Sequence, residues 1–220
     1  AKLSIPKFDL SKTDGQIAAL KSPSPNVREL GRAPLETTGP KAIPAVKALL
    51  SDSNSFIQAR AVWLLAKLGP KGLAEVENLL DHKDPQMRIA AFRALRHEEH
   101  RTLEYAAKLA GDSSPLVRRE VALALRYVPF EKSRDLLLKI AAGYDGKDRY
   151  YVEAFGIGCT DKEDKVYAAL REKRSTKDFD PVYAGLAWRL HPVGAIGELK
   201  GWAMDKERDA ALRRSMLFAI

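Results

Sequence analysis

The 220-residue sequence contains a single cysteine, Cys159, so no disulfide can form within the chain. A Cys-x-x-Cys-His motif is absent, and four histidines in all provide few ligands for a metal centre. No apolar run approaches the ~18 residues that a membrane-spanning helix requires. These absences exclude a disulfide-stabilised scaffold, a covalently attached c-type haem and a membrane-spanning helix. With 45% hydrophobic and 30% charged residues, the chain has the composition of a folded globular protein.

A repeat of 30 residues is the strongest pattern in the sequence. Three slots of the repeat hold similar residues in each of four copies. The first slot holds Val27, Ile57, Met87 and Val117, the next holds Arg28, Gln58, Arg88 and Arg118, and the third holds Leu35, Leu65, Leu95 and Leu125. Such self-similarity is typical of stacked repeats, in which each unit buries its apolar face against its neighbours.

Each repeat has the signals of a helix, a tight turn and a second helix. Short polar residues followed by proline predict the starts of first helices, at Ser24-Pro25, Asp84-Pro85, Ser114-Pro115 and Asp180-Pro181. At each start we expect the polar side chain to cap the free backbone N–H groups of the helix. Gly39-Pro40 and Gly69-Pro70 predict turns in which glycine ends one helix and proline begins the next. The sequence therefore predicts an all-α, right-handed α-α superhelix of six to seven helix pairs.

The regularity of the spacing divides the chain into three parts. Residues 1–23 form a lead-in and cap, 24–143 hold four regular repeats, and 144–220 hold two or three divergent ones. The regular repeats are expected at 24–52, 54–82, 84–111 and 114–143, and the divergent ones near 148–174, 180–205 and from 207. The apolar end of the chain, without a partner helix, favours a piece of a larger protein.

Three kinds of residue invite a structural interpretation. Gly156 and Gly158 lie in the first helix of the fifth repeat, where glycine is unfavourable, so we expect close packing against a neighbour. Cys159 has no histidine near it in sequence and is expected to be a packing thiol. Trp63 and Trp188 occur among alanines and leucines at helical spacing, and we expect both in the core.

The segments Asp84–Leu95 and Ser114–Leu125 resemble the HEAT repeat, with valine-arginine or methionine-arginine following the proline and then alanines and leucine. In that family the arginine usually pairs with an aspartate near an adjacent turn. The resemblance assigns this structural ladder to Arg28, Arg88 and Arg118, with Asp84 at the turn. Gln58 departs from the pattern and places the second repeat's pair in question.

A narrower resemblance concerns the segments Ile5–Leu10, Thr13–Pro23 and Asp145–Gly158. They are similar to the HEAT segment of sorbosone-dehydrogenase-like, haem-binding multidomain proteins of planctomycetes and verrucomicrobia. In those proteins a dehydrogenase propeller precedes the HEAT array and a cytochrome-type module follows it. The resemblance implies a periplasmic or secreted location, but no redox residue of that family has a counterpart here.

The densest group of potential metal ligands is Arg96–His100, which contains His97, His100 and two glutamates. HEAT-type di-iron hydroxylases use several His-Glu pairs on different repeats, whereas this chain has one. We therefore expect a solvated loop there and predict no catalytic residue, no metal and no cofactor.

The net charge of +8 comes from 17 basic against 12 acidic residues in 1–110 and 20 against 17 in the rest. The second helices line the concave face of HEAT arrays, and they carry a set of cations that we treat as the candidate binding face. This set is Lys41, Lys71, Arg101, Lys108, Arg134 and Lys139. Acidic residues such as Glu75, Glu77 and Glu104 share these helices, which disfavours a groove that follows phosphates.

The sequence thus favours a non-catalytic scaffold that binds a protein partner or neighbouring domains of the same chain. The alternative is a basic HEAT-like DNA-binding protein, or a solenoid of the alkylpurine DNA glycosylase type. Charge and length are its only support, because no aspartate flanked by aromatic residues is present to act as the catalytic acid.

Overall fold

The computed structural model describes residues 7–173 and 180–217, and throughout these residues the secondary structure is helical, without a strand. The chain divides into two compact units, Ala1–Thr102 and Leu103–Ile220. Within the described ranges no helix is both long and apolar enough to cross a membrane. The fold is an α-α solenoid of helix pairs, as the sequence predicts.

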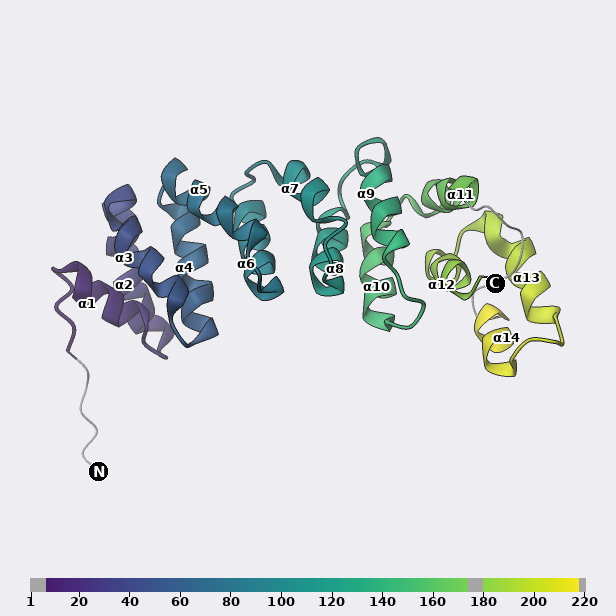
Figure 1. Ribbon diagram of the computed structural model, residues 1–220, viewed down its shortest axis with the longest axis horizontal. Helices are drawn as coiled ribbons and strands as arrows, with labels where there is room; N and C mark the ends of the chain where they lie inside the picture. Colours follow the sequence, from purple (N-terminus) through teal and green to yellow (C-terminus); the bar gives the residue numbers. More distant parts are fainter. Residues whose placement is uncertain (1–6, 174–179, 218–220) are drawn as a thin grey trace, which may run out of the picture. The chain divides into compact units, whose positions relative to one another are not determined.

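Unit 1 contains a leading helix followed by helix pairs joined by short 3-10 turns (Figure 1). Its helices are α1 (Thr13–Leu20), α2 (Pro25–Thr38), α3 (Ile43–Ala48), α4 (Ser55–Lys67), α5 (Pro70–Asn78) and α6 (Pro85–His97). Helix α4 packs against both α2 and α6, the first helices of the flanking pairs, and against α3 and α5. The first helices therefore form one layer and the second helices another.

Unit 2 continues the alternation. Its helices are α7 (Thr102–Leu109), α8 (Pro115–Ala124), α9 (Phe130–Ala142), α10 (Arg149–Gly158), α11 (Glu163–Lys173), α12 (Pro181–Leu190), α13 (Ile196–Met204) and α14 (Ala210–Leu217). Helix α10 packs against α8 and α12, while α11 packs against α9. The division into units falls at the first residue of α7, whereas the sequence spacing changes near residue 143.

The predicted helix starts are confirmed, with proline in the first turn of α2, α6, α8 and α12. The carboxylates of Asp84 and Asp180 accept hydrogen bonds from the backbone N–H two residues later, each at 2.9 Å. Ser24 and Ser114 occupy the same position without a side-chain capping bond, so the expected hydroxyl caps are wrong there. In those two helices proline alone marks the start.

The turn glycines also behave as expected. Gly39 and Gly69 have φ values of 65° and 80°, a region that L side chains rarely adopt. Pro70 then begins α5, while the proline after Gly39 lies in a 3-10 turn that leads into α3. A sharp reversal thus separates the two helices of each of these pairs.

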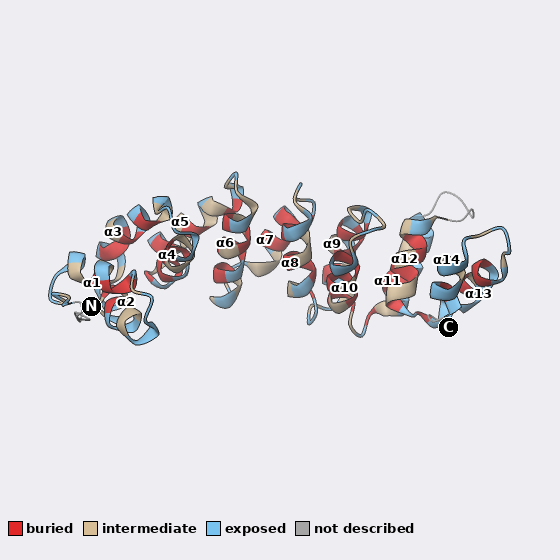
Figure 2. Ribbon diagram, turned by 90° about the horizontal axis from the view of Figure 1, so that it is seen from below, coloured by how far each residue is buried: buried red, intermediate tan, exposed pale blue. Residues whose placement is uncertain are grey.

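The repeated leucines form the centre of the core, since Leu35, Leu65, Leu95 and Leu125 are all fully buried. Figure 2 shows the buried residues on the helix faces that look toward neighbouring helices, with exposed residues on the outer faces. Each pair therefore buries its apolar side against the next pair in its unit, which is how a solenoid is stabilised.

The glycines of α10 are explained by close packing. A Cβ at Gly158 would lie 2.5 Å from the backbone oxygen of Ala122 in α8. A Cβ at Gly156 would overlap the guanidinium group of Arg189 in α12. Next to them Cys159 is fully buried, and burial raises the pKa of its thiol to about 12. Cys159 is therefore a packing thiol, and its side chain is fully buried.

Candidate interaction surfaces

The second slot of the repeat forms a ladder of side-chain to backbone hydrogen bonds. In each of the four copies, a side-chain nitrogen donates to the carbonyl oxygen six residues earlier. The pairs are Arg28 to Ser22 at 3.4 Å, Gln58 to Asp52 at 2.7 Å, Arg88 to His82 at 2.7 Å and Arg118 to Asp112 at 2.5 Å. Gln58 therefore substitutes for arginine in this bond.

The partners of Arg28 and Arg118 in this ladder differ from the expected aspartate carboxylates. Arg28 donates to the Ser22 and Pro23 carbonyls, and Arg118 donates to three backbone carbonyls and to the Tyr151 hydroxyl at 2.9 Å. At these two positions the expected ion pair is thus replaced by bonds that satisfy carbonyls of the inter-repeat turns, which have no helical partner. Asp84 caps α6 as described above.

The six cations of the candidate binding face are divided between the units, three in each. Lys41 lies in a 3-10 turn and Arg101 precedes α7, so these two are not on second helices as expected. Lys71 and Lys108 are exposed on α5 and α7. Arg134 on α9 pairs with Asp135 at 3.0 Å, and the Lys139 side chain lies over Gly111.

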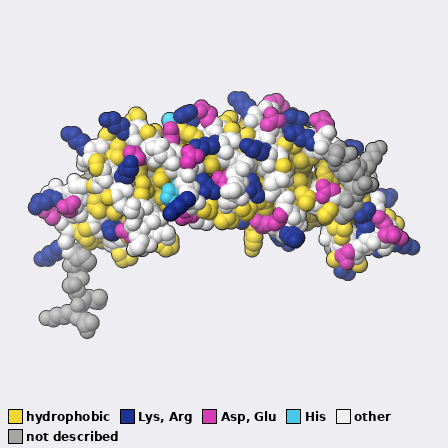
Figure 3. All heavy atoms as spheres, viewed as in Figure 1, with side chains coloured by type: hydrophobic (Ala, Val, Ile, Leu, Met, Phe, Trp, Pro, Cys, Tyr) yellow, Lys and Arg dark blue, Asp and Glu magenta, His cyan; other side chains and the backbone are white. Residues whose placement is uncertain are grey.

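Acidic side chains also pair with cations on and beside the second helices. In unit 1, Lys47 on α3 pairs with Glu75 on α5 at 2.7 Å, and Arg101, just before α7, lies 3.8 Å from Glu77. In unit 2, Lys165 pairs with Glu131 at 3.2 Å. Figure 3 shows Lys and Arg interspersed with Asp and Glu across the visible face of each unit. The arrangement is a mixed-charge surface, unlike the cation-lined groove that tracks a phosphate backbone.

The two histidines of the Arg96–His100 cluster point to different partners. The ring of His97 meets Trp63 edge-on, with centroids 5.5 Å apart, whereas Nε2 of His100 lies 2.7 Å from Oε1 of Glu77. Among the described residues no group of three or more His, Cys, Asp and Glu side chains is placed to hold a metal ion. The cluster is therefore divided between two local contacts.

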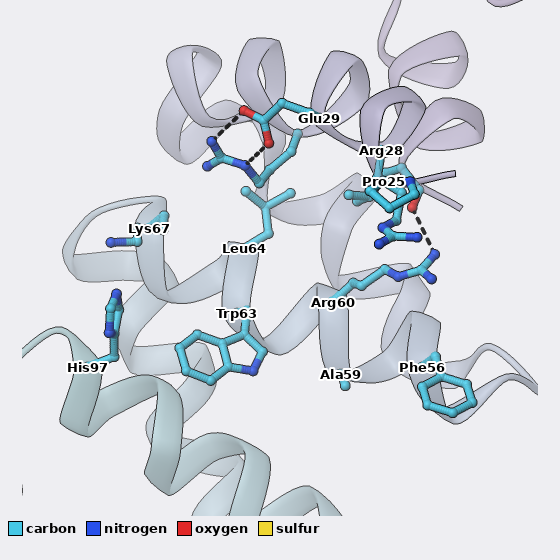
Figure 4. A pocket seen from close by; sticks show the side chains of 12 residues that line it. Pro25, Arg28, Glu29, Phe56, Ala59, Arg60, Trp63, Leu64, Lys67 and His97 are labelled. Atoms are coloured by element: carbon cyan, nitrogen blue, oxygen red, sulfur yellow. Dashed lines mark hydrogen bonds and ion pairs between the residues drawn. The ribbon is translucent and has the colours of Figure 1, made fainter. Parts of the chain in front are cut away.

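A hollow of about 670 Å³ lies among the first helices of unit 1 (Figure 4). We call it the α2–α4 hollow. It is lined mainly by α2 and α4, with Leu20 from α1 and His97 from α6 at its edges. Trp63 points into it and is 40% exposed, so the expectation that this tryptophan is a core residue is wrong. Phe56, two turns earlier on α4, is 74% exposed and lines the same hollow.

The charges around this hollow are unevenly distributed. Arg28 and Arg60 lie side by side on one side of Trp63, and Lys67 and His97 lie on the other (Figure 4). The pKa of Arg60 is lowered by burial and by the charge of Arg28. Glu29 is the acidic residue of the lining, and Arg32 holds it with two hydrogen bonds of 2.7 and 2.8 Å. The Arg28–Arg60 side of the hollow is therefore positively charged.

The other two tryptophans and Tyr151 are part of the packing in unit 2, whereas Tyr127 and Tyr150 are exposed there. Trp202 is buried, with its ring edge-on to Tyr183, while Trp188 is half-buried beside His191. Tyr151 is buried, and its hydroxyl donates to the Ile140 carbonyl at 2.7 Å. None of these residues repeats the exposed arrangement of Phe56 and Trp63.

The repeat itself contains the signal for this hollow. Every residue in the slot of Trp63 is exposed, namely Ala33, Arg93 and Leu123 in the other three copies. The slot of Phe56 is likewise exposed at Asn26, Gln86 and Leu116. Comparing slots across copies, instead of judging Trp63 by its local apolar neighbours, would have placed both aromatics on the surface.

These elements define an α-α solenoid built from helix pairs, a class that usually braces or binds other molecules. The model of the family described as HEAT repeats matches residues 13–96 and 73–154, and the chain belongs to this family. No curated protein matches the sequence. An engineered protein, whose crystal structure comes from the Northeast Structural Genomics Consortium, is similar over 94% of this chain and 67% of its own. The two are 18% identical, with a TM-score of 0.43.

Proposed function

We propose that this chain is a non-catalytic scaffold that holds a protein partner against the helices of unit 1. The observation that supports this most is the exposed pair Phe56 and Trp63 beside unneutralised arginines in the α2–α4 hollow. Exposed aromatic residues next to arginine are the composition that protein interfaces favour. By contrast, the ladder and the capping residues are engaged in holding turns and helix ends, as their hydrogen bonds indicate.

The second part of the proposal concerns the larger protein to which this chain would belong. The chain serves as a segment of a secreted redox protein, between a dehydrogenase module and a haem module, in an extracytoplasmic location. Its support is the resemblance of the segments Ile5–Leu10, Thr13–Pro23 and Asp145–Gly158, which lie far apart in the chain. Stacked helix pairs would keep two such modules at a fixed separation.

The test of this context is the intact mass and visible absorption spectrum of the native gene product from its source. We expect a mass several times 24.4 kDa together with a haem Soret band. A product near 24.4 kDa without a chromophore would contradict the redox context.

Binding to DNA has less support, because the cations of the second helices stand among acidic partners. If it were the function, duplex affinity would fall steeply with salt, and charge reversal at Lys71 and Arg101 would weaken it. We expect neither effect in a binding assay with the purified chain.

A further inference from the structure

We propose that the α2–α4 hollow of unit 1 binds an acidic peptide segment that carries bulky aromatic side chains. The inference rests on the proposed interaction function and specifies its partner and its site. It places recognition on the first helices, whereas the cations of the second helices were the candidate face from sequence.

The apolar half of the site comes from α4. Phe56 and Trp63 are seven residues apart, which places them on one face of the helix, two turns from each other. Ala59 lies between them, and the buried Leu64 forms part of the lining (Figure 4). A hollow of about 670 Å³ is within the range of sites that enclose a ligand, and two exposed rings can contact an aromatic side chain in offset or edge-on geometry.

The charged half comes from Arg28 and Arg60. Each uses its Nη1 atom to donate to carbonyls at the end of α1 and the turn that follows, for Arg60 the carbonyls of Leu20, Lys21 and Ser22 at 3.2 Å. These bonds fix both guanidinium groups in place. Their Nε and Nη2 atoms have no hydrogen-bond acceptor in the part of the chain that the structure describes. Two fixed guanidinium groups with free donors suit a carboxylate, which accepts two parallel bonds.

The charged side chains around the α2–α4 hollow favour a peptide over a polyanion. Lys67 at the far edge is paired with Glu98 at 2.7 Å, and Arg32 holds Glu29 and Glu36. These carboxylates would repel a phosphate chain running along α4, whereas a peptide needs only one or two carboxylates, placed at Arg28 and Arg60. Hence the site combines a localised positive region with an aromatic surface, which matches alternating acidic and aromatic residues.

The test is isothermal titration calorimetry of the full chain with an acetylated, amidated octapeptide, Gly-Glu-Glu-Phe-Glu-Glu-Phe-Gly. Two comparison peptides replace every glutamate by lysine or every phenylalanine by alanine. We expect binding of the first peptide, with affinity falling as salt rises, and at least roughly tenfold weaker binding of both others. Equal binding of the lysine peptide would overturn the proposal, as would no binding of any peptide.

Matched variants locate the site. The double variant Phe56→Ala/Trp63→Ala removes the exposed rings, while Leu116→Ala/Leu123→Ala makes the corresponding changes in the same slots of the fourth repeat. All four side chains are exposed, so both variants should fold, as circular dichroism can verify. We expect at least roughly tenfold weaker binding for the first variant and less than roughly twofold change for the second. Equal effects in the two variants would contradict the site.

A last arm distinguishes the partner class and separates this inference from the proposed function. A short oligothymidylate should not compete with the peptide, and competition that depends on Trp63 would indicate a nucleic-acid site instead. If the native product proves to be a large haem protein but no peptide binds, the peptide site is wrong and the redox context stands. If the peptide binds and the product is small and colourless, the redox context is wrong and the site stands.

Discussion

Replacing Gly31 by alanine should loosen the leading helix α1, which covers the start of the array. Gly31 is buried in the interior of α2, where α1 crosses it. An added Cβ would lie 2.6 Å from the backbone nitrogen of Leu20 and would overlap the carbonyl oxygen of Gln16. Because both atoms belong to the backbone, the methyl group can be accommodated only if α1 moves away.

The magnitude follows from two opposing effects. Alanine in a helix interior is more favourable than glycine by about 0.5–1 kcal/mol. Overpacking against a rigid neighbour costs about 1–3 kcal/mol. We therefore expect a net loss of about 1–2 kcal/mol in the free energy of unfolding. Gly201→Ala in α13 is the control, because nothing lies within 4 Å of its Cβ position, and it should gain about 0.5–1 kcal/mol.

Urea unfolding followed by circular dichroism measures both variants, and hydrogen exchange reports on the amides of α1. In Gly31→Ala the amides of Thr13–Leu20 should exchange faster than in the unmodified chain. If Gly31→Ala were stabilising to the same degree as Gly201→Ala, the close crossing of α1 and α2 would be refuted. Residues 13–20 would then not act as the cap of unit 1.

Three further predictions concern polar groups that are buried or half-buried. Arg118→Ala should lower the free energy of unfolding by about 2–3 kcal/mol and Gln58→Ala by about 1 kcal/mol, because Arg118 makes four hydrogen bonds and Gln58 one. Equal losses in urea titrations of the two variants would contradict the ladder of hydrogen bonds. Lys162→Met should lower the free energy of unfolding by about 2–4 kcal/mol, since the buried ammonium group caps the end of α8 by donating to three carbonyls that follow it, at 3.0 Å each. An unchanged free energy of unfolding in calorimetry would argue against this capping role. The pKa of Cys159 is raised from 9.0 to about 12, so its contribution to stability is complete below pH 9 and is lost as pH rises toward 12. Unfolding should therefore become easier over this range, less steeply in Cys159→Ala, and the native thiol should resist Ellman's reagent at pH 8 until the chain is unfolded.

The helix pairs were predictable because the 30-residue repeat places residues of the same kind at the same positions in four copies. The apolar slots of Leu35 and Leu65 must be buried in every copy, and proline after Asp84 or Asp180 marks a start that local chemistry determines. The glycines of α10 were also interpretable, since a glycine in a helix interior needs a packing reason. The capping hydroxyls of the two serines failed because proline already fixes the helix start without their hydrogen bond.

The hollow could not be predicted by the same reasoning. Trp63 has apolar neighbours in sequence, and local hydrophobicity favours burial, yet its slot faces solvent in every copy. The pairing of Arg28 with Arg60 depends on how α2 and α4 meet α1, a tertiary relation that a single helix pattern does not contain. Likewise the ladder's carbonyl partners depend on turn geometry, so a family expectation of aspartate pairs was misleading for Arg28 and Arg118.

The most direct test of the central claim is the indole N–H region of a ¹⁵N spectrum during titration with the acidic octapeptide. The chain has three tryptophans, of which Trp63 lies in unit 1 and Trp188 and Trp202 in unit 2, and Trp63→Phe assigns the first signal. We expect the Trp63 indole signal to shift on binding while the other two stay in place. Binding of the peptide with an unmoved Trp63 signal would show that the peptide docks elsewhere and that the α2–α4 hollow is not the binding site.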